Sequence, residues 1–335
     1  MTVHEQVIRY STEVGSDPML IQGAGGNASW KDGTTLWIKA SGTWLSDAAQ
    51  KDIFVPIDIP QTLALIDSGA SDLSAARIGN SHLRPSIETC LHALLPQKFV
   101  IHFHAVDVIA HAALRDGRDK LAQRLQGLDW TWVDYVKPGP DLARAVTASI
   151  GQAKAPEILV LGNHGLVIAA PTLEHLDHLL KEVLARCAIP PRIAPATLPE
   201  QLASLAAQWD DMGYVLPEDQ RCHALALDAV CLHLAGTAWV LYPDHAVFLG
   251  AHATIVDTPW ASGRTGPAPE CVIVPGRGVL VRKDLSAGQL AMLSCYADVT
   301  LRLDSTEEVA PLSHSDIAEL LNWDAEKYRQ SLNAV

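Results

Sequence analysis

Hydrophobic positions in the first half of the chain follow two alternating periods. The helical period occurs in residues 3–14, 86–95, 141–150 and 173–187. Short apolar runs typical of strands occupy residues 99–105, 157–161 and 166–169, and Lys31-Asp32-Gly33 marks a hairpin turn between two short strands. This mixture predicts an α/β fold with a layered sheet.

A cluster of prolines divides the chain. Pro190, Pro191, Pro195 and Pro199 all fall within an eleven-residue stretch, residues 189–199. Because each proline fixes φ and lacks a backbone N–H, neither a helix nor an inner strand is expected there. We therefore expect an N-terminal domain at residues 1–189, a linker at residues 190–200 and a smaller C-terminal α/β region at residues 201–335.

The pattern after the linker is plainer. Residues 223–234 have helical spacing, and residues 238–249 and 271–282 resemble strands. We expect Ser315 to cap a final helix with Trp323 on its inner face. The histidines and glycines of this region have neither metal-ligand nor phosphate-binding spacing, so we expect no catalytic group and no nicotinamide site there.

Composition narrows the range of partners. The chain has 25 Lys and Arg against 38 Asp and Glu, a formal net charge of −13. Nucleic acids and anionic membranes select basic surfaces, so we expect neither as a partner. No apolar run is long enough to cross a bilayer, and we do not expect the polar N-terminus to act as a signal peptide. The six cysteines are scattered without a C-x-x-C pair and are expected to be reduced core thiols of a cytoplasmic protein.

Three histidines are the strongest chemical signal. His102 and His104 lie on a predicted strand, where alternation turns both imidazoles to one face. His164 stands between Gly162 and Gly165, where one short strand ends and another begins. Three neutral imidazoles that hold a divalent cation leave a position open for substrate, as in catalytic metal sites. The alternative is that the histidine pair lies on the surface or in the core.

Glu88 precedes the histidine strand, in the first turn of a predicted helix. A carboxylate near a divalent cation can act as general acid and base. A glutamate in a first helical turn is also favoured by the helix dipole alone. His92 lies one turn further along the same face. It is either a group that supports the metal ligands or a core histidine, and we favour the core.

A glycine-rich loop at residues 23–28 fits the pattern G-x-G-x-x-A. A dinucleotide site needs a helix after this loop, whereas a hairpin is predicted here, so we reject that interpretation. Backbone N–H groups of such a loop can still bind an anion. We therefore expect a phosphate or carboxylate to be bound by the loop and the following strand end, through Gly25, Asn27, Lys39, Ser41 and Gly42. The alternative is that these are ordinary turn residues.

Four segments in this order resemble the class II aldolase/adducin family. They read GAGGNASWKDGTTLWIKASG, RPSIETCLHALL, VIHFHAVDVIA and LVLGNHGLVIA and cover roughly residues 5–188. The resemblance implies a three-layer α/β/α domain with a central, largely antiparallel sheet. It also implies a divalent metal, usually Zn²⁺ or else Mn²⁺ or Co²⁺, on His102, His104 and His164. Glu88 would be the acid/base group, and a homotetramer would carry its sites at subunit interfaces.

The resemblance further implies that the phosphate of a small sugar-phosphate-like substrate lies against Asn27, Ser41, Gly42 and Ser86. Two positions depart from the family pattern. Ser86-Ile87 stands where two hydroxyl residues are usual, and Lys39-Ala40 precedes Ser-Gly where Thr-Pro or Ser-Pro is common. The segments VIVPGRGVLV and DIAELLNWDAEKYR resemble the middle of longer proteins that join a rhamnulose-phosphate-aldolase-like domain to a short-chain dehydrogenase.

Together these features predict a metal-dependent lyase that acts on a sugar phosphate or related hydroxy-ketone through an enediolate. The same chemistry serves decarboxylases, dehydratases and epimerases, which the motifs do not separate. An adducin-like scaffold without activity is a second interpretation, disfavoured because all three histidines and Glu88 are present. A third is that a separate dehydrogenase docks on the C-terminal region.

Overall fold

A computed structural model describes residues 1–70, 73–151, 154–259 and 267–332. The first 187 residues contain the strands β1 (Asn27–Asp32), β2 (Thr35–Lys39), β3 (Phe54–Asp58), β4 (Phe99–Phe103), β5 (Trp130–Val133), β6 (Ile158–Leu161) and β7 (Gly165–Ala170). Their helices are α1 (Val3–Gly15), α2 (Ile59–Asp67), α3 (Thr89–Leu94), α4 (Val106–Ala112), α5 (Gly117–Arg124), α6 (Pro140–Ile150) and α7 (Leu173–Cys187).

The seven strands form one sheet in the order β3-β2-β1-β4-β7-β6-β5. Neighbouring strands run antiparallel except β5 and β6, which are parallel. The predicted hairpin is present, since Asp32 of β1 pairs with Thr35 of β2. The sheet confirms the predicted α/β fold with a largely antiparallel centre.

Helices cover both faces of this sheet, which makes the three layers. Strand alternation on β4 turns Phe99, Ile101 and Phe103 into the core shared with α1, α4 and α7. Val100 points the other way and packs with residues of α3 and α6. His102 has the same parity as Val100, so alternation directs it toward the α3 face.

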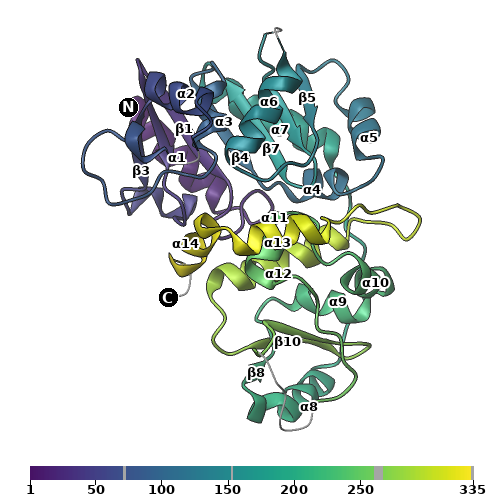
Figure 1. Cartoon of the computed structure of the whole chain (residues 1–335). Helices are drawn as coiled ribbons and strands as arrows, with labels where there is room; N and C mark the ends of the chain where they lie inside the picture. The colour runs from purple at the N-terminus through teal and green to yellow at the C-terminus, as the bar shows by residue number, and fades with distance from the viewer. Residues whose placement is uncertain (71–72, 152–153, 260–266, 333–335) are drawn as a thin grey trace.

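The C-terminal region holds a second, three-stranded sheet in the order β8-β10-β9. Its strands are β8 (Tyr214–Val215), β9 (Cys271–Val274) and β10 (Gly278–Arg282). Its helices are α8 (Pro199–Trp209), α9 (Ala224–Leu227), α10 (Ala229–Thr237), α11 (Pro243–Leu249), α12 (Ala287–Thr300), α13 (His314–Asn322) and α14 (Asp324–Leu332). Figure 1 shows α11, α12, α13 and α14 between the two sheets.

A continuous core joins the two parts. Val106 and Ile109 of α4 belong to the same hydrophobic cluster as Tyr242, Tyr296 and Leu320 of the C-terminal region. Apolar burial therefore continues across the boundary, and the C-terminal helices are packed against the larger sheet domain.

Two predictions for the C-terminal region were wrong. Residues 238–249 do not form a strand, because residues 243–249 form helix α11 with Pro243 in its first turn. All seven of its residues are buried, so neither period is visible in the sequence. The helix predicted to be final and capped by Ser315 is instead α13, capped by Ser313 through a capping box with Asp316, and a break at Trp323 separates it from the last helix, α14.

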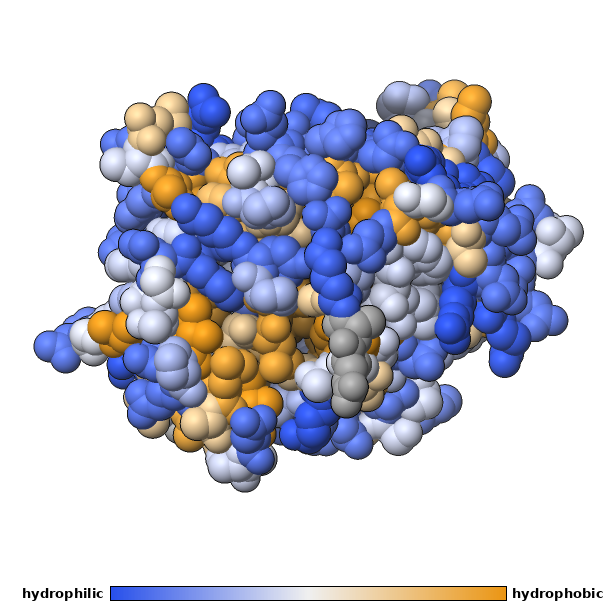
Figure 2. Space-filling view, turned by 90° about the horizontal axis from the view of Figure 1, so that it is seen from above, coloured by the Kyte–Doolittle hydropathy of each residue, from blue (hydrophilic) through white to orange (hydrophobic). Residues whose placement is uncertain are grey.

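The burial of the cysteines and the polarity of the surface are consistent with the composition of the chain. All six cysteines are buried, and none forms a disulfide. Among the described residues, no helix combines the length and apolar character needed to cross a bilayer. Figure 2 shows hydrophilic side chains over most of the end formed by the larger sheet domain, with hydrophobic patches between them.

Candidate metal centre

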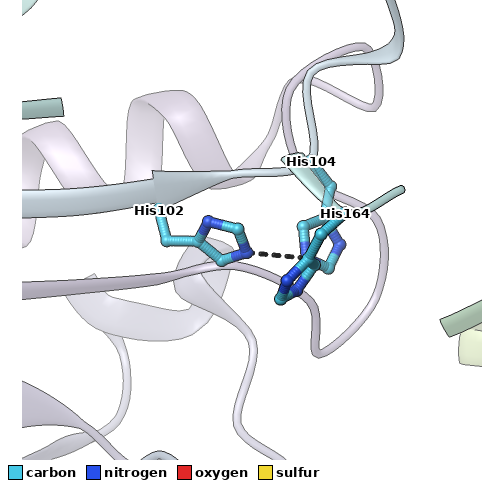
Figure 3. A group of neighbouring side chains, drawn as sticks. All are labelled: His102, His104 and His164. Atoms are coloured by element: carbon cyan, nitrogen blue, oxygen red, sulfur yellow. Dashed lines mark hydrogen bonds between the residues drawn. The ribbon is translucent and has the colours of Figure 1, made fainter. Parts of the chain in front are cut away.

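The pairing of β4 with β7 brings the three histidines together. His102 pairs with Val167, and Phe103 pairs with Leu166. Because the two strands are antiparallel, the residue after β4 lies beside the residue before β7. These residues are His104 and His164, and Figure 3 shows all three imidazoles turned toward one another.

The geometry of the three imidazoles fits a divalent cation. One ligand nitrogen from each lies within 4.8 Å of the others, and the Nε2 atoms of His102 and His104 are 3.0 Å apart. Two nitrogens bound to one tetrahedral ion at 2.0–2.1 Å are about 3.3 Å apart. Burial lowers the pKa of His104 and that of His164, the latter to about 3, so both rings are neutral as metal ligation requires.

The turn before β7 has a backbone suited to this close approach. Asn163 adopts φ of +47°, which asparagine tolerates better than most residues. A Cβ at Gly165 would lie 2.4 Å from the carbonyl oxygen of Phe103. Glycine at that position therefore lets the turn that carries His164 reach the end of β4.

Glu88 faces two of the histidines from the start of α3. It is the N-cap residue and not part of the first turn as predicted, because α3 begins at Thr89 and not near residue 86. Its Oε2 lies 3.7 Å from His102 Nε2, and its Oε1 lies 3.8 Å from His164 Nε2. Burial raises the pKa of Glu88, but the electrostatic attraction of these two imidazoles and a hydrogen bond from Asn27 lower it more, so the net pKa is lowered. The carboxylate is thus held ionised beside the imidazoles.

Asn27 holds Glu88 through the register of β1 and β4. Asn27 pairs directly with His102, and its Nδ2 donates to Glu88 Oε2 at 2.7 Å and to Ser86 Oγ at 3.3 Å. Glu88 Oε1, by contrast, has no hydrogen-bond partner within the described part of the chain. One carboxylate oxygen, Oε2, is thus anchored by Asn27, and the other, Oε1, faces His164 without a hydrogen bond.

His92 lies in the core, as we interpreted it. It is fully buried, with Nδ1 2.7 Å from Ser29 Oγ. Lys31 donates to its backbone carbonyl oxygen. The three-histidine group does not include it.

The glycine-rich loop is braced by Lys39. The Lys39 Nζ donates to the carbonyl oxygens of Ala24 and Gly26, both at 2.9 Å, and burial lowers its pKa to about 7. The N–H of Gly25 donates to Gln22, so this group is engaged within the loop. A Cβ at Gly25 would lie 2.7 Å from His104 Nδ1, so glycine makes room for that imidazole. A strand and not a helix follows the loop, as predicted.

An inner cavity of about 30 Å³ lies beside these groups. Eight of the ten predicted site residues line it: Asn27, Lys39, Ser41, Gly42, Ser86, Glu88, His104 and His164. Gly25 and His102 do not, since Gly25 packs on His104 and His102 lies behind, in β4.

The C-terminal region reaches into the same cavity. Asp244, Glu326 and Arg329 line it, and each is at most 9% exposed. Arg329 pairs with both carboxylates. No site residue was predicted in this region, because helical spacing reveals a buried face but not the distant surface that it covers. The only signal was the segment DIAELLNWDAEKYR, which contains Glu326 and Arg329.

A larger outer cavity of about 480 Å³ adjoins the inner one. Ser41, Ser86 and Ile87 line both. The outer cavity also has Arg77 and Arg84, and the Arg84 guanidinium stacks 4.1 Å above the ring of Tyr328 in α14. It therefore offers positive charge and hydroxyl groups next to the metal centre.

Comparisons with known proteins match the larger sheet domain. The chain is 31% identical over 186 residues to "Uncharacterized oxidoreductase YuxG" of Bacillus subtilis, which is 51% of this chain but 27% of that protein. The chain thus spans about a quarter of the length of that curated relative.

Two solved structures align over a similar part of the chain. The N-terminal class II aldolase domain of a Thermoplasma acidophilum protein has 27% identity and a TM-score of 0.49, covering 56% of this chain and 92% of its own. An L-fuculose 1-phosphate aldolase has 20% identity and a TM-score of 0.40, covering 55% and 82%. The model of the class II aldolase and adducin N-terminal domain matches residues 5–189, more than half of the chain. The chain therefore belongs to the class II aldolase and adducin family.

Proposed function

We propose that this protein is a metal-dependent lyase of the class II aldolase type, acting on a sugar phosphate or a related hydroxy-ketone. The observation that carries the proposal is the buried group of three histidines with Glu88 facing two of them. A scaffold without activity has no need of a buried carboxylate oriented on three imidazoles, and burying such groups costs stability.

His102, His104 and His164 would hold the cation, which when bound supplies a Lewis acid for the substrate oxygens. Glu88 would take and return a proton at Oε1, the oxygen that Asn27 leaves unbonded. Its lowered pKa keeps it in the basic form. Asn27 fixes the other oxygen, so the proton is exchanged at one defined atom.

The anionic end of the substrate would lie against Ser41 and Ser86, where the two cavities meet. Gly42 and Asn27 border the same place, and Lys39 supports it by holding the glycine loop. Arg77 and Arg84 add positive charge on the outer side. In a chain of net charge −13, an anion needs this local compensation.

The inner cavity holds about as much as one water molecule, far less than a sugar phosphate. Glu326 and Arg329 of α14 occupy its remaining side. The outer cavity of about 480 Å³, which shares Ser41 and Ser86 with the inner one, would therefore hold the rest of the substrate.

The test is turnover of a panel of ketose 1-phosphates and acid-sugar phosphates by protein loaded with Zn²⁺, Mn²⁺ or Co²⁺. The expected result is metal-dependent release of an aldehyde from at least one of them. Metal-dependent loss of CO₂ or water, or epimerisation, without aldehyde would replace the aldolase assignment by one of those reactions. No reaction with any metal would overturn the proposal.

The same proposal carries two expectations from the family resemblance, a homotetramer and a cytoplasmic location. Analytical ultracentrifugation tests the first. A monomer at micromolar concentration would contradict it.

A further inference from the structure

A segment of the C-terminal region lies directly against the histidine group. The ring of Tyr242 meets that of His104 edge to face, with centroids 5.2 Å apart. Asn163, the residue before His164, donates its side-chain N–H groups to the carbonyl oxygens of Leu241 and Ala310. Both histidine-bearing turns are therefore in contact with residues beyond position 200.

The ring nitrogens of His102 and His104 are arranged in the same way. His102 has Nδ1 3.2 Å from the carbonyl oxygen of Leu166, an acceptor, which leaves Nε2 for the centre of the group. His104 also turns its Nε2 inward, 3.0 Å from that of His102. Its Nδ1 therefore needs an acceptor on the outer side.

Asp244 is the group in that position. Its Oδ2 lies 3.4 Å from His104 Nδ1, and the two side chains are 2% and 3% exposed. Neither atom has a hydrogen-bond partner within the described part of the chain. Two buried polar atoms that face each other at this separation satisfy one another with only a small adjustment.

The aspartate is itself held in place. It lies in the first turn of α11, after Pro243, and Arg329 of α14 donates to its other oxygen, Oδ1. Arg329 also pairs with Glu326 at 3.3 Å. The arginine thus orients the carboxylate so that Oδ2 points at the imidazole.

We propose that Asp244 is a positioning residue of the metal centre: it accepts the Nδ1 proton of His104 and holds the Nε2 lone pair toward the cation. The C-terminal region then completes a site whose ligands all come from the N-terminal domain. This rests on the proposed role of the three histidines as metal ligands. Groups that orient metal-bound histidines in this way typically change metal affinity about 10–100-fold when removed.

The first test is Zn²⁺ affinity, measured by competition with a chromophoric chelator on metal-free protein. Asp244→Asn should weaken binding about 10–100-fold. The matched control is Asp298→Asn, which removes another buried carboxylate of the same region, one that pairs with Arg221 and does not line the inner cavity. It should bind Zn²⁺ as wild type does. Equal affinity for wild type and Asp244→Asn, or equal losses in both variants, would overturn the proposal.

The second test uses wild-type protein and so does not depend on the variant's folding. Nitrogen-15 NMR of metal-free protein, with His104→Gln to identify the signals, should show the His104 proton on Nδ1. A proton on Nε2 with Nδ1 bare would overturn the proposal. Neither test needs turnover, so a protein that binds zinc but cleaves no sugar phosphate would refute the proposed lyase and leave this inference intact.

Discussion

In the proposed reaction Glu88 accepts and returns the proton. The variant Glu88→Gln tests this role separately from any structural role of the side chain. Glu88→Gln should keep the fold and the metal content but lower kcat about 10²–10⁴-fold, the usual contribution of a general acid/base group. The amide can still meet Asn27 but cannot accept a proton.

Steady-state kinetics beside elemental analysis of the same sample checks this. His92→Gln is a suitable control, because His92 is also buried beside β4 but bonds to Ser29 and not to the centre. If Glu88→Gln turns over substrate as fast as wild type, Glu88 is only the N-cap residue of a helix and not an acid/base group.

Ser41 and Lys39 test the position of the anion. Ser41→Ala should raise KM about fivefold, as expected for one neutral hydrogen bond of about 1 kcal/mol. Lys39→Met should raise it tenfold or more, because the glycine loop loses two charge-assisted hydrogen bonds. Metal content should stay at the wild-type level in both.

An unchanged KM in both variants would place the anion in the outer cavity instead, near Arg84. Comparison with Arg84→Gln in the same assay identifies that outcome.

The orientation of His102 and His104 toward one face could be predicted from the sequence, because strand alternation is strictly local. The residues that surround this pair could not be predicted in the same way. Asn27 meets Glu88 only because it pairs with His102 across β1 and β4, and strand register is a long-range property. Gly25 was predicted to bind an anion, yet in the structure its N–H is bonded to Gln22 and its missing side chain makes room for His104. Asp244 approaches from 140 residues away in sequence and leaves no local signal.

Helices α11 and α14 are linked by a buried charge cluster, in which Arg329 serves both Asp244 and Glu326. Arg329→Met should lower the free energy of unfolding by about 3–5 kcal/mol, because it leaves buried carboxylates without their cation. Urea denaturation of the metal-free protein measures this.

The control for that prediction is Arg115→Met. Arg115 pairs with Glu308 on the surface, where the side chains are 71% and 80% exposed. Exposed pairs of this kind contribute about 0–1 kcal/mol. A loss for Arg329→Met no larger than that of the control would contradict a buried link between the two helices.

Elements with a clear period were predicted well, and the failures have a common cause. The helices near residues 3–14, 141–150 and 173–187 show an apolar face because one side meets solvent. Helix α11 is buried all round, so its sequence carries no period, and it was mistaken for a strand. It is also the element that brings Asp244 to the site.

Buried neutral histidines should make the whole molecule sensitive to acid. Burial lowers the pKa of His164 and His245 to about 3, and it also lowers the pKa of His111 and His223. Below about pH 6.5 the unfolded chain therefore binds protons that the folded chain refuses, so stability falls as the pH falls. Each strongly shifted histidine contributes up to about 1.4 kcal/mol per pH unit.

Glu326 acts in the opposite direction, because burial raises its pKa to about 7, but it offsets only one of these groups. Urea denaturation of metal-free protein should thus show the free energy of unfolding falling by more than about 2 kcal/mol between pH 7 and pH 5. A flat profile over this range would mean that the histidines are accessible to protons in the folded state.

The central proposal is that His102, His104 and His164 hold a divalent cation that the reaction requires. Elemental analysis of protein purified without chelator tests it most directly, with His102→Ala purified in parallel. The expected result is about one divalent metal ion per wild-type chain and a large loss in the variant, since His102 supplies one of three ligands. A wild-type protein without metal, or a variant that retains as much as wild type, would contradict the proposal.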